Sequence, residues 1–474
     1  MNGGHVFPHS WPRIHASVAV LSRHMHCLAI NLYSGSMCEQ AILNSHSPNY
    51  LPRIADRILA RKLAGMGAIL IKGPKWVGKT TTAEQHASSV IYIDQPDKVE
   101  ANIMASQVDP MLLLDGETPR LIDEWQVAPK LWDAVRWCVD RRKADGQFIL
   151  TGSSVPLDMD VQADTVHHSG TGRIAQMLMR PMSLWESRDS DGSVSLRELF
   201  AGNDGIAGRS DRNIHDIAYL ICRGGWPRAV MLDREIALDR AMDYLNATAD
   251  VDIHRVDGVS RSGRTTRALL RSYAHLQGKQ ASLAAICEDM KANGGPSIDD
   301  RTAFSYVEAL KKLFVIEDMP AWNPNLRSKT AIRTSDTRYF IDPSLAVAAL
   351  GVGPETLTKD LRTMGLFFEA MCVRDLRVYA ESLGGSVSHY RDKTGLECDA
   401  VVHLADGSYG LIEIKIGGET AINEAVQSLQ KLASKIDTDK MPSRSFLMVL
   451  TAVGNYAMKR NDGVLEVPIC CLKD

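Results

Sequence analysis

Residues 73–81 read GPKWVGKTT and directly follow the apolar run AILI at 68–71. A glycine, four residues and then Gly78-Lys79-Thr80 is the spacing at which the N–H groups of a loop surround phosphate oxygens. Lys79 would reach the β- and γ-phosphates, and the Thr80 hydroxyl would sit on Mg²⁺. A plain turn between a strand and a helix needs neither side chain. The stretch therefore predicts a site for ATP or GTP, with these binding residues: Gly73, Pro74, Lys75, Trp76, Val77, Gly78, Lys79, Thr80 and Thr81.

A second short strand, expected at 119–124 (PRLIDE), ends in two carboxylates. Asp123 would hold the Mg²⁺ through water, and Glu124 would polarise the attacking water. An acidic helix N-terminus would give the same letters. The phosphate loop upstream favours the hydrolytic interpretation.

Residues 147–153 (QFILTGS) predict another buried strand with polar residues at its end. In ATPases that carry an additional strand between the two motifs, such a residue senses the γ-phosphate. Thr151 is the first candidate and Ser153 the second. Arg173, in the flexible segment GTGR, is a candidate for stabilising charge on the transferred phosphoryl group, in its own or a neighbouring subunit. A solvated loop arginine is the alternative for Arg173.

A second group of chemically active residues lies near the end of the chain. Glu413 and Lys415, in LIEIKI, are two apart on an expected strand and so share one face. Asp399, in ECDAVV, belongs to the neighbouring hairpin strand, and Glu369 to a preceding helix. Two carboxylates and a lysine at adjacent strands can bind Mg²⁺ through Asp399 and Glu413 and activate water against a phosphodiester. An ordinary salt bridge on a half-exposed sheet is the alternative.

The spacing from Asp399 to Glu413-x-Lys415 is similar to the PD-(D/E)xK nuclease fold, with Glu369 as the acidic residue of its first helix. The full series GPKWVGKTT, LIDEWQ, ILTGSS, GTGRIAQMLMRPMSLWE and GGWP resembles a widespread group of prokaryotic AAA-type ATPases. The C-terminal half of that group is catalogued as domain of unknown function 4143. The resemblance covers about residues 50–460. It implies an AAA+ core, a winged-helix module and a C-terminal nuclease-like fold.

The elements around these motifs predict an α/β chain of several domains. Short apolar runs alternate with helical stretches from 68 to about 185, which is typical of a parallel sheet with crossover helices. We expect a disordered leader at 1–49, with Met37 as an alternative start. The AAA+ P-loop domain follows at 50–213 and ends in a polar linker or insertion at 187–213. A helical and winged-helix module (214–345) and an α/β restriction-endonuclease-like domain (346–474) complete the prediction.

The middle module gives a weaker indication of its partner. Residues 281–319 have the layout of a helix-turn-helix followed by a hairpin. The recognition helix expected near 300–313 carries acidic residues beside its basic ones, which is poor for phosphate contact. The arginines between 255 and 271 form a better basic patch, although a solvated helix face has the same composition. A packing or protein-contact role is therefore favoured over DNA binding.

Bulk composition narrows the class of protein. At 474 residues the chain is long enough for two or three domains, and its formal net charge of −3 gives no global field for nucleic acid. Its 9 cysteines have no CxxC spacing, and Cys470 and Cys471 are adjacent, which suits neither a zinc site nor a disulfide framework. No apolar run reaches the ~20 residues that span a bilayer. We expect a cytoplasmic protein with no membrane partner.

Three functions are compatible with these features. The first is an Mg²⁺-dependent ATPase whose cycle moves a nuclease-like domain that binds or cleaves nucleic acid, DNA before RNA, in a homo-oligomer or alone. The second is a nucleotide-switched DNA-binding or signalling protein whose nuclease-like domain is catalytically inactive. The third is an interaction protein in which slow ATP hydrolysis times an assembly. The complete set of Asp399, Glu413 and Lys415 favours the first.

Overall fold

The computed structural model describes Met1 and residues 50–152, 170–323, 335–436, 441 and 443–474. The chain separates into two units, 1–52 and 53–474, and the architecture below is that of the second. The predicted leader lies outside the described residues apart from Met1. No helix in the described part of the chain combines the length and apolar character needed to cross a membrane.

The first sheet has five parallel strands in the order β2-β3-β4-β1-β5. Its strands are Ala68–Lys72 (β1), Ser89–Tyr92 (β2), Arg120–Asp123 (β3), Phe148–Gly152 (β4) and Ile174–Leu178 (β5). β4 lies between the strand that leads into the phosphate loop and the strand that ends at Asp123. The additional strand expected from the sequence is thus present, and it carries Thr151.

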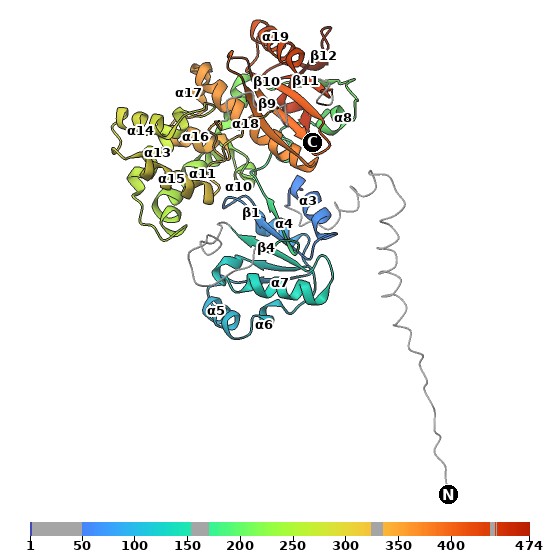
Figure 1. Ribbon diagram of the computed structural model, residues 1–474, viewed down its shortest axis with the longest axis vertical. Helices are drawn as coiled ribbons and strands as arrows, with labels where there is room; N and C mark the ends of the chain where they lie inside the picture. The colour runs from blue at the N-terminus through green and yellow to red at the C-terminus, as the bar shows by residue number, and fades with distance from the viewer. Residues whose placement is uncertain (2–49, 153–169, 324–334, 437–440, 442) are drawn as a thin grey trace. The chain divides into compact units, whose positions relative to one another are not determined.

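Helices cover both faces of this sheet (Figure 1). They are Ile54–Leu63 (α3), Lys79–Glu84 (α4), Val99–Val108 (α5), Met111–Leu114 (α6) and Leu131–Arg142 (α7), with a 3-10 turn at Trp125–Val127 (η1). Ile69 and Ile71 of β1 are buried in the same apolar cluster as α3, whereas Ala68 and Leu70 share a cluster with α7. The alternation follows from the two-residue period of a strand.

The middle of the chain is helical. Its helices are Ile214–Arg223 (α9), Pro227–Val230 (α10), Arg234–Ala247 (α11), Thr248–Asp252 (η3), Ile253–Arg255 (α12), Gly263–His275 (α13), Leu283–Ala292 (α14), Asp300–Lys312 (α15), Pro343–Leu350 (α16) and Pro354–Lys359 (α17). Asp299 caps α15 by accepting a hydrogen bond from the Thr302 amide at 2.7 Å. Two antiparallel bridges, Ile316 with Phe340 and Met319 with Thr337, follow α15. The winged-helix assignment of this module stays a prediction.

The C-terminal part is a seven-stranded mixed sheet in the order β7-β12-β13-β11-β10-β9-β8. Its strands are Gly208–Arg209 (β7), Gly385–Arg391 (β8), Glu397–Leu404 (β9), Tyr409–Lys415 (β10), Phe446–Thr451 (β11), Tyr456–Lys459 (β12) and Leu465–Pro468 (β13). β8, β9 and β10 are antiparallel neighbours, and β10 runs parallel to β11.

Two long helices accompany this sheet: Leu361–Ser382 (α18) and Glu419–Lys435 (α19). Ile412 and Ile414 of β10 belong to the apolar cluster that contains the α18 core residues, while Leu411 belongs to the cluster of α19. α18 and α19 therefore cover opposite faces. Glu413 lies on the α19 face, since it is two residues from Leu411.

The segment 187–213, predicted as a linker or insertion of the P-loop domain, contributes to the C-terminal part instead. Its strand β7 pairs with β12, and Val194–Ser195 (β6) pairs with Leu472–Lys473 (β14), which follows the turn Ile469–Cys471 (η4). Leu196–Phe200 (α8) lies between β6 and β7. Its polar composition concealed this pairing because strands of two residues have no readable period. The predicted end of the P-loop domain at residue 213 is therefore too late, because β6 and β7 pair with strands of the C-terminal part.

Candidate functional site

The loop after β1 adopts the conformation that its glycines allow. Gly73 has φ +150° and Gly78 has φ +93°, and a Cβ on Gly73 would lie 2.2 Å from the backbone oxygen of Met179. Lys79 Nζ donates to the carbonyl oxygens of Gly73 at 2.9 Å and Pro74 at 2.8 Å, so the lysine closes the loop on itself. Burial lowers the pKa of Lys79 to about 8, against the opposing charges of Glu124 and Asp123.

Two hydroxyl groups converge on the first carboxylate. Thr80 Oγ1 donates to Asp123 Oδ1 at 2.7 Å, and Thr151 Oγ1 donates to the same oxygen. Thr151 is fully buried, and its hydroxyl oxygen also accepts from the Glu124 amide at 3.3 Å. Thr151 therefore lies behind Asp123 and orients it. The role of Thr151 in sensing the γ-phosphate stays a prediction, and Ser153 lies outside the described residues.

Glu124 is the second carboxylate, and it faces the cleft beside the loop. Its backbone has φ +52°, an uncommon conformation for a residue with a side chain, often found at functional sites. Burial raises the pKa of its carboxyl, while Lys79 works in the opposite direction. Gln126 Nε2 donates to Glu124 Oε2. The carboxylate is thus held by a neutral amide near the lysine, in a setting that makes it a stronger base.

The cleft itself has a volume of about 910 Å³ and is closed from the other side by the helical module. Three cationic side chains of that module line it: Arg228, Arg240 and Arg255. Trp226 and Pro227 line it too, and Pro227 Cγ lies 3.6 Å from where a Cβ on Gly78 would be. The volume falls in the range of small-ligand sites, and the cleft is lined by basic side chains together with the acidic Asp94, Glu124 and Asp252.

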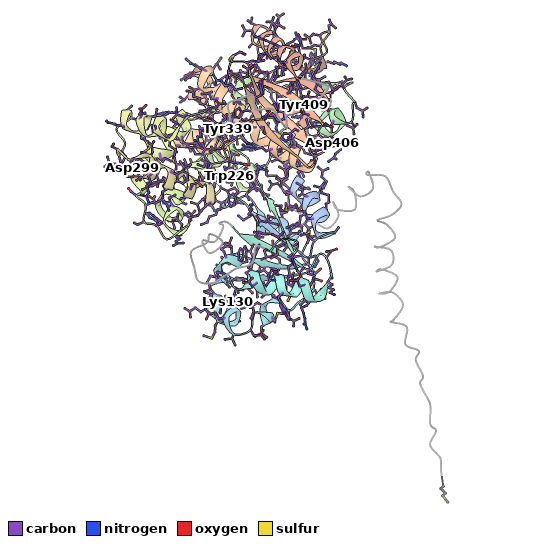
Figure 2. All side chains as sticks on the ribbon, viewed as in Figure 1. Lys130, Trp226, Asp299, Tyr339, Asp406 and Tyr409 are labelled. Carbon is purple, nitrogen blue, oxygen red and sulfur yellow. The ribbon has the colours of Figure 1, made fainter. Side chains whose placement is uncertain are left out.

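Aromatic and ionic contacts fix the loop against the same module. Trp226, labelled in Figure 2, stacks on Tyr244 with a ring separation of 4.7 Å, and Trp76 meets Tyr244 edge-on at 5.4 Å. Lys75 Nζ lies 2.6 Å from Asp252 Oδ1. Among the predicted loop residues, Lys75 and Trp76 therefore contact the module as well as lining the cleft.

Arg173 lies at the N-terminal ends of the parallel strands, whereas the phosphate loop lies at their C-terminal ends. It directly precedes β5, whose first residue pairs with Ala68 at the start of β1, whereas the phosphate loop follows the end of β1. Its guanidinium Nε donates to Asp140 at 2.8 Å. This position gives no support to action of Arg173 on a nucleotide in its own subunit, because the length of β1 separates Arg173 from the phosphate loop. Action on a neighbouring subunit stays a prediction.

The structure brings together the second group of predicted residues. Lys415 Nζ donates to Glu413 Oε2 at 2.6 Å and to Asp399 Oδ2 at 3.0 Å, and the Ile414 amide donates to the same Asp399 oxygen at 2.7 Å. Glu413 is 3% exposed, and its other oxygen, Oε1, is buried with no hydrogen-bond partner. Burial and the neighbouring Asp399 raise the pKa of Glu413 well above its usual range. We call Glu369, Asp399, Glu413 and Lys415 the carboxylate–lysine site.

Glu369, on α18, interacts with Asp399 and Lys415 of this site through their charges. Burial and the charge of Asp399 raise its pKa to about 8, and the charge of Lys415 acts in the opposite direction. The hydroxyl of Tyr339, labelled in Figure 2, donates to Glu369 Oε1. In the described part of the chain, no group of three or more histidine, cysteine or acidic side chains is arranged to hold a metal ion. A cation at Asp399 and Glu413 would thus have two protein carboxylates and would compete with the ammonium of Lys415.

Comparisons with known proteins agree with the prediction of an AAA-type domain around the phosphate loop. Residues 66–187 match a family model described as an AAA domain, and residues 364–472 match the domain of unknown function DUF4143. The chain carries an AAA-type P-loop ATPase domain followed by a DUF4143 domain. Residues 214–356, between them, match the domain of unknown function DUF8612. The predicted α/β class with a parallel AAA-type sheet is confirmed, and nucleotide binding is implied for the AAA domain.

Relatives of the whole chain are more distant. The uncharacterized proteins Rv2008c of Mycobacterium tuberculosis and Mb2031c of Mycobacterium bovis are each 24% identical over 380 residues, which cover 79% of this chain and 76% of theirs. The Walker-type ATPase PABY2304 of Pyrococcus abyssi is 16% identical with a TM-score of 0.40, covering 64% of this chain and 97% of its own. The ORC1 protein of Aeropyrum pernix, solved in complex with DNA, is 18% identical with a TM-score of 0.24, covering 68% and 96%.

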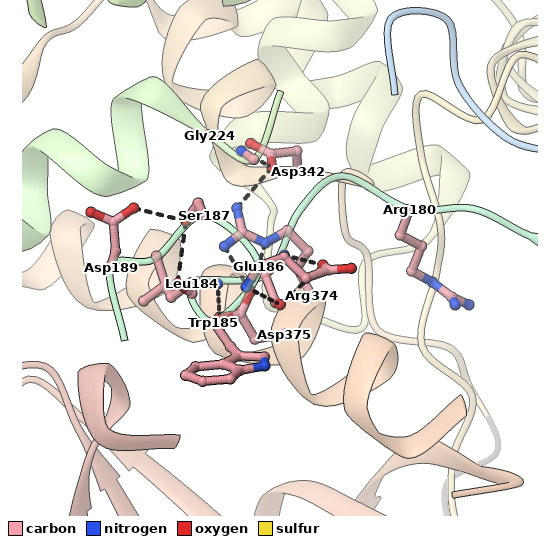
Figure 3. Close-up of polar contacts among 12 residues, drawn as sticks. Arg180, Leu184, Trp185, Glu186, Ser187, Asp189, Gly224, Asp342, Arg374 and Asp375 are labelled. Atoms are coloured by element: carbon pink, nitrogen blue, oxygen red, sulfur yellow. Dashed lines mark hydrogen bonds and ion pairs between the residues drawn. The ribbon is translucent and has the colours of Figure 1, made fainter. Parts of the chain in front are cut away.

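A buried polar network joins the AAA domain to the first helix of the DUF4143 domain (Figure 3). Asp342 Oδ2 accepts from the Gly225 amide and from Arg374 Nη1, both at 2.9 Å. Asp375 accepts from Arg374 Nε at 2.8 Å and from the Leu184 amide at 2.9 Å. These contacts fix the GGWP loop and the segment around 184 to α18, the helix that also carries Glu369.

Several residues contribute to the AAA site although the sequence did not predict that role for them. Arg228, Arg240 and Arg255 belong to separate helical stretches, and no spacing relates them to the loop. The GGWP motif was visible at 224–227 but had no assigned role. Arg53 was visible in YLPRIAD, before the first helix, and only the fold brings it to the phosphate loop.

Proposed function

We propose that the AAA domain binds ATP with Mg²⁺ in the cleft and hydrolyses it. The observation that carries this proposal is the convergence of Thr80 and Thr151 on Asp123, next to Lys79 and Glu124. Hydroxyl and carboxylate oxygens are preferred ligands of Mg²⁺, so Thr80 and Asp123 fit the ion. The bound ion would neutralise charge on the phosphates during transfer.

The side chains of the chain itself divide the remaining work. Lys79 binds the β- and γ-phosphates once it leaves the carbonyl oxygens of Gly73 and Pro74. Glu124 accepts a hydrogen bond from the attacking water and takes its proton at a carboxylate oxygen. Arg228, Arg240 and Arg255 add positive charge from the helical module, so nucleotide binding draws that module towards the loop.

ADP release by the full-length protein tests this proposal. Lys79→Ala should abolish turnover and weaken ATP binding, because the lysine supplies the main charge for the phosphates. Lys98→Ala is the matched control, since that lysine is exposed at the start of α5. Turnover that is equal in wild type and Lys79→Ala would contradict the proposal.

The position of Arg173 leads us to propose trans action in a homo-oligomer. Arg173→Ala subunits have an intact loop, and Lys79→Ala subunits have an intact arginine. A mixture of the two inactive variants should therefore regain part of the ATP turnover, as mixed active sites form. Mixtures that stay as inactive as either variant would remove Arg173 from the reaction.

For the DUF4143 domain we propose a nuclease-like site of the PD-(D/E)xK type that binds nucleic acid, DNA before RNA, and cleaves it with a divalent cation. The unpartnered Glu413 Oε1 supports a cation held by Glu413 and Asp399. The opposing observation is that Lys415 pairs with both carboxylates, which satisfies their charges without a cation. That pairing favours the second candidate, a nucleotide-switched binding or signalling protein with an inactive nuclease-like domain.

The middle module gives little support to DNA binding of its own. Arg261 is buried against Asp257, and Arg267 pairs with Asp250. Arg255 lines the nucleotide cleft. Three of the five arginines of the predicted basic patch thus have other partners, and a protein-contact role for this predicted winged-helix module is the better proposal.

A cleavage assay separates the two candidates for the DUF4143 domain. Single- and double-stranded DNA and RNA are incubated with Mg²⁺ or Mn²⁺ and the wild type, Lys415→Ala or Lys459→Ala. Lys459 is a matched control because it is half-exposed and pairs with Asp204, away from the site. Cleavage lost only in Lys415→Ala supports the nuclease. Cleavage that survives Lys415→Ala would end that assignment, and retention of nucleic acid without cleavage would favour the inactive binding protein.

A further inference from the structure

The arginine that precedes the first described helix is in contact with the phosphate loop. Arg53 is 6% exposed, and each of its guanidinium nitrogens has a partner. Nη1 donates to the carbonyl oxygen of Val77 at 2.9 Å, Nη2 to the carbonyl oxygen of Arg180 at 2.8 Å, and Nε to Glu186 Oε1 at 3.0 Å. A buried guanidinium with this geometry is a rigid clamp.

The contact with Val77 fixes the orientation of one peptide group in the loop. In a trans peptide, the C=O and the following N–H point in opposite directions. The carbonyl of Val77 points to Arg53, so the N–H of Gly78 points away from Arg53. Gly78 lines the cleft, and its φ of +93° is available to glycine without strain. The N–H of Gly78 is thus one of the donors that a phosphate in the cleft would meet.

Glu186 holds the arginine in place. Its Oε1 also accepts from the Ile54 amide at 2.8 Å, and its Oε2 accepts from the Ser183 amide at 2.8 Å and the Ser183 hydroxyl at 3.0 Å. The carboxylate is 2% exposed in its side chain, so this ion pair is shielded from solvent. The clamp on the loop therefore depends on the segment 183–186, which follows the AAA sheet.

We propose that Arg53, held by Glu186, is a positioning residue of the nucleotide site that directs the Gly78 amide at the phosphates. This inference rests on the proposed binding of ATP at the loop. Arg53 does not touch the nucleotide itself. It acts through one peptide group of the loop. Its loss should therefore weaken the binding of ATP and the binding of the transition state by the same amount.

The test compares Arg53→Met/Glu186→Gln with the wild type in the full-length protein. Glutamine keeps one oxygen acceptor for either the Ile54 or the Ser183 amide, and methionine leaves no unpaired buried charge, so the double variant avoids the main cost of breaking a buried ion pair on one side. The readouts are the Kd of a fluorescent ATP analogue, the KM and kcat of ADP release, and the thermal midpoint. We expect Kd and KM to rise at least about tenfold relative to the wild type, with kcat within about threefold.

Other results would overturn the inference or its basis. A role of Arg53 in folding alone would lower kcat, through a smaller active fraction, and leave KM and Kd unchanged; that result would refute the positioning role. Arg53→Lys keeps the charge but loses the fork, so it should show the same KM effect if the double variant is unstable, and an unchanged KM in Arg53→Lys would count against the proposal. Arg57→Met, on the helix that follows Arg53, is the control, because Arg57 pairs with Asp474. Absence of ATP binding in the wild type would instead refute the proposed function.

Discussion

At the scale of single residues, the nucleotide site depends on the protonation of Lys79 as well as on distances. Lys79 is buried between the loop carbonyls and the carboxylate pair, and its pKa is lowered to about 8. The phosphates of a bound nucleotide would stabilise the ammonium form and raise that pKa again. Nucleotide binding is therefore linked to uptake of a proton by this lysine at alkaline pH.

The linkage gives a prediction with a definite sign. Well below pH 8 the lysine is already charged, so it adds little pH dependence to ATP affinity below about pH 7. Above pH 8 the Kd should rise, approaching tenfold per pH unit until the pKa of the complex is reached. Titration of a fluorescent ATP analogue from pH 7.5 to 9.5 measures this. Lys79→Arg should show a flat profile, because a guanidinium keeps its charge; a flat wild-type profile would contradict the pKa of Lys79.

At the scale of elements, the buried network of Figure 3 connects the GGWP loop and the segment around Leu184 to α18. Arg374 is 2% exposed in its side chain and pairs with Asp342 and Asp375, which are both fully buried. Burial raises the pKa of Asp375 to about 6 despite the neighbouring arginine. Removal of the guanidinium would leave two buried carboxylates without their partner.

Arg374→Ala should therefore destabilise the protein by about 3–5 kcal/mol, the usual cost of breaking a buried pair on one side. Thermal unfolding measures the effect as a lower midpoint. Arg209→Ala is the matched control, because its pair with Asp211 is exposed by 70% and 79% and such pairs contribute little. Equal midpoints for the two variants would show that the network does not hold these elements together.

The GGWP loop is a second element whose packing leaves no room. A Cβ on Gly225 would lie 2.1 Å from the backbone oxygen of Met182. Gly225→Ala should force this loop off the segment around 182 and cost about 1–3 kcal/mol or more. ATP affinity should fall with it, because Trp226 and Pro227 line the cleft. Gly205→Ala, where no atom lies within 4 Å, is the control, and equal stability and affinity in both variants would refute the close packing.

At the scale of the whole molecule, the features that could be predicted from the sequence are those that depend on the spacing of residues close together in the chain. The loop, the strand ending at Asp123 and the additional strand with Thr151 were recognisable because each combines an apolar run with polar residues at its end. The pairing of Glu413 with Lys415 followed from strand alternation. The place of Arg173, the strands within 187–213 and the arginines of the cleft were not recognisable, because they depend on which edge of a sheet or which face of a module meets the loop.

We propose that the AAA domain hydrolyses ATP through Glu124. Glu124→Gln keeps the shape of the side chain and its hydrogen bonding but removes the base. The most direct measurement is ADP formation and ATP binding by Glu124→Gln in parallel with wild type, with Glu117→Gln, an exposed residue before β3, as control. We predict a loss in kcat of about 10²-fold or more with an ATP Kd within about threefold of wild type. Unchanged turnover in Glu124→Gln would rule out Glu124 as the base of ATP hydrolysis.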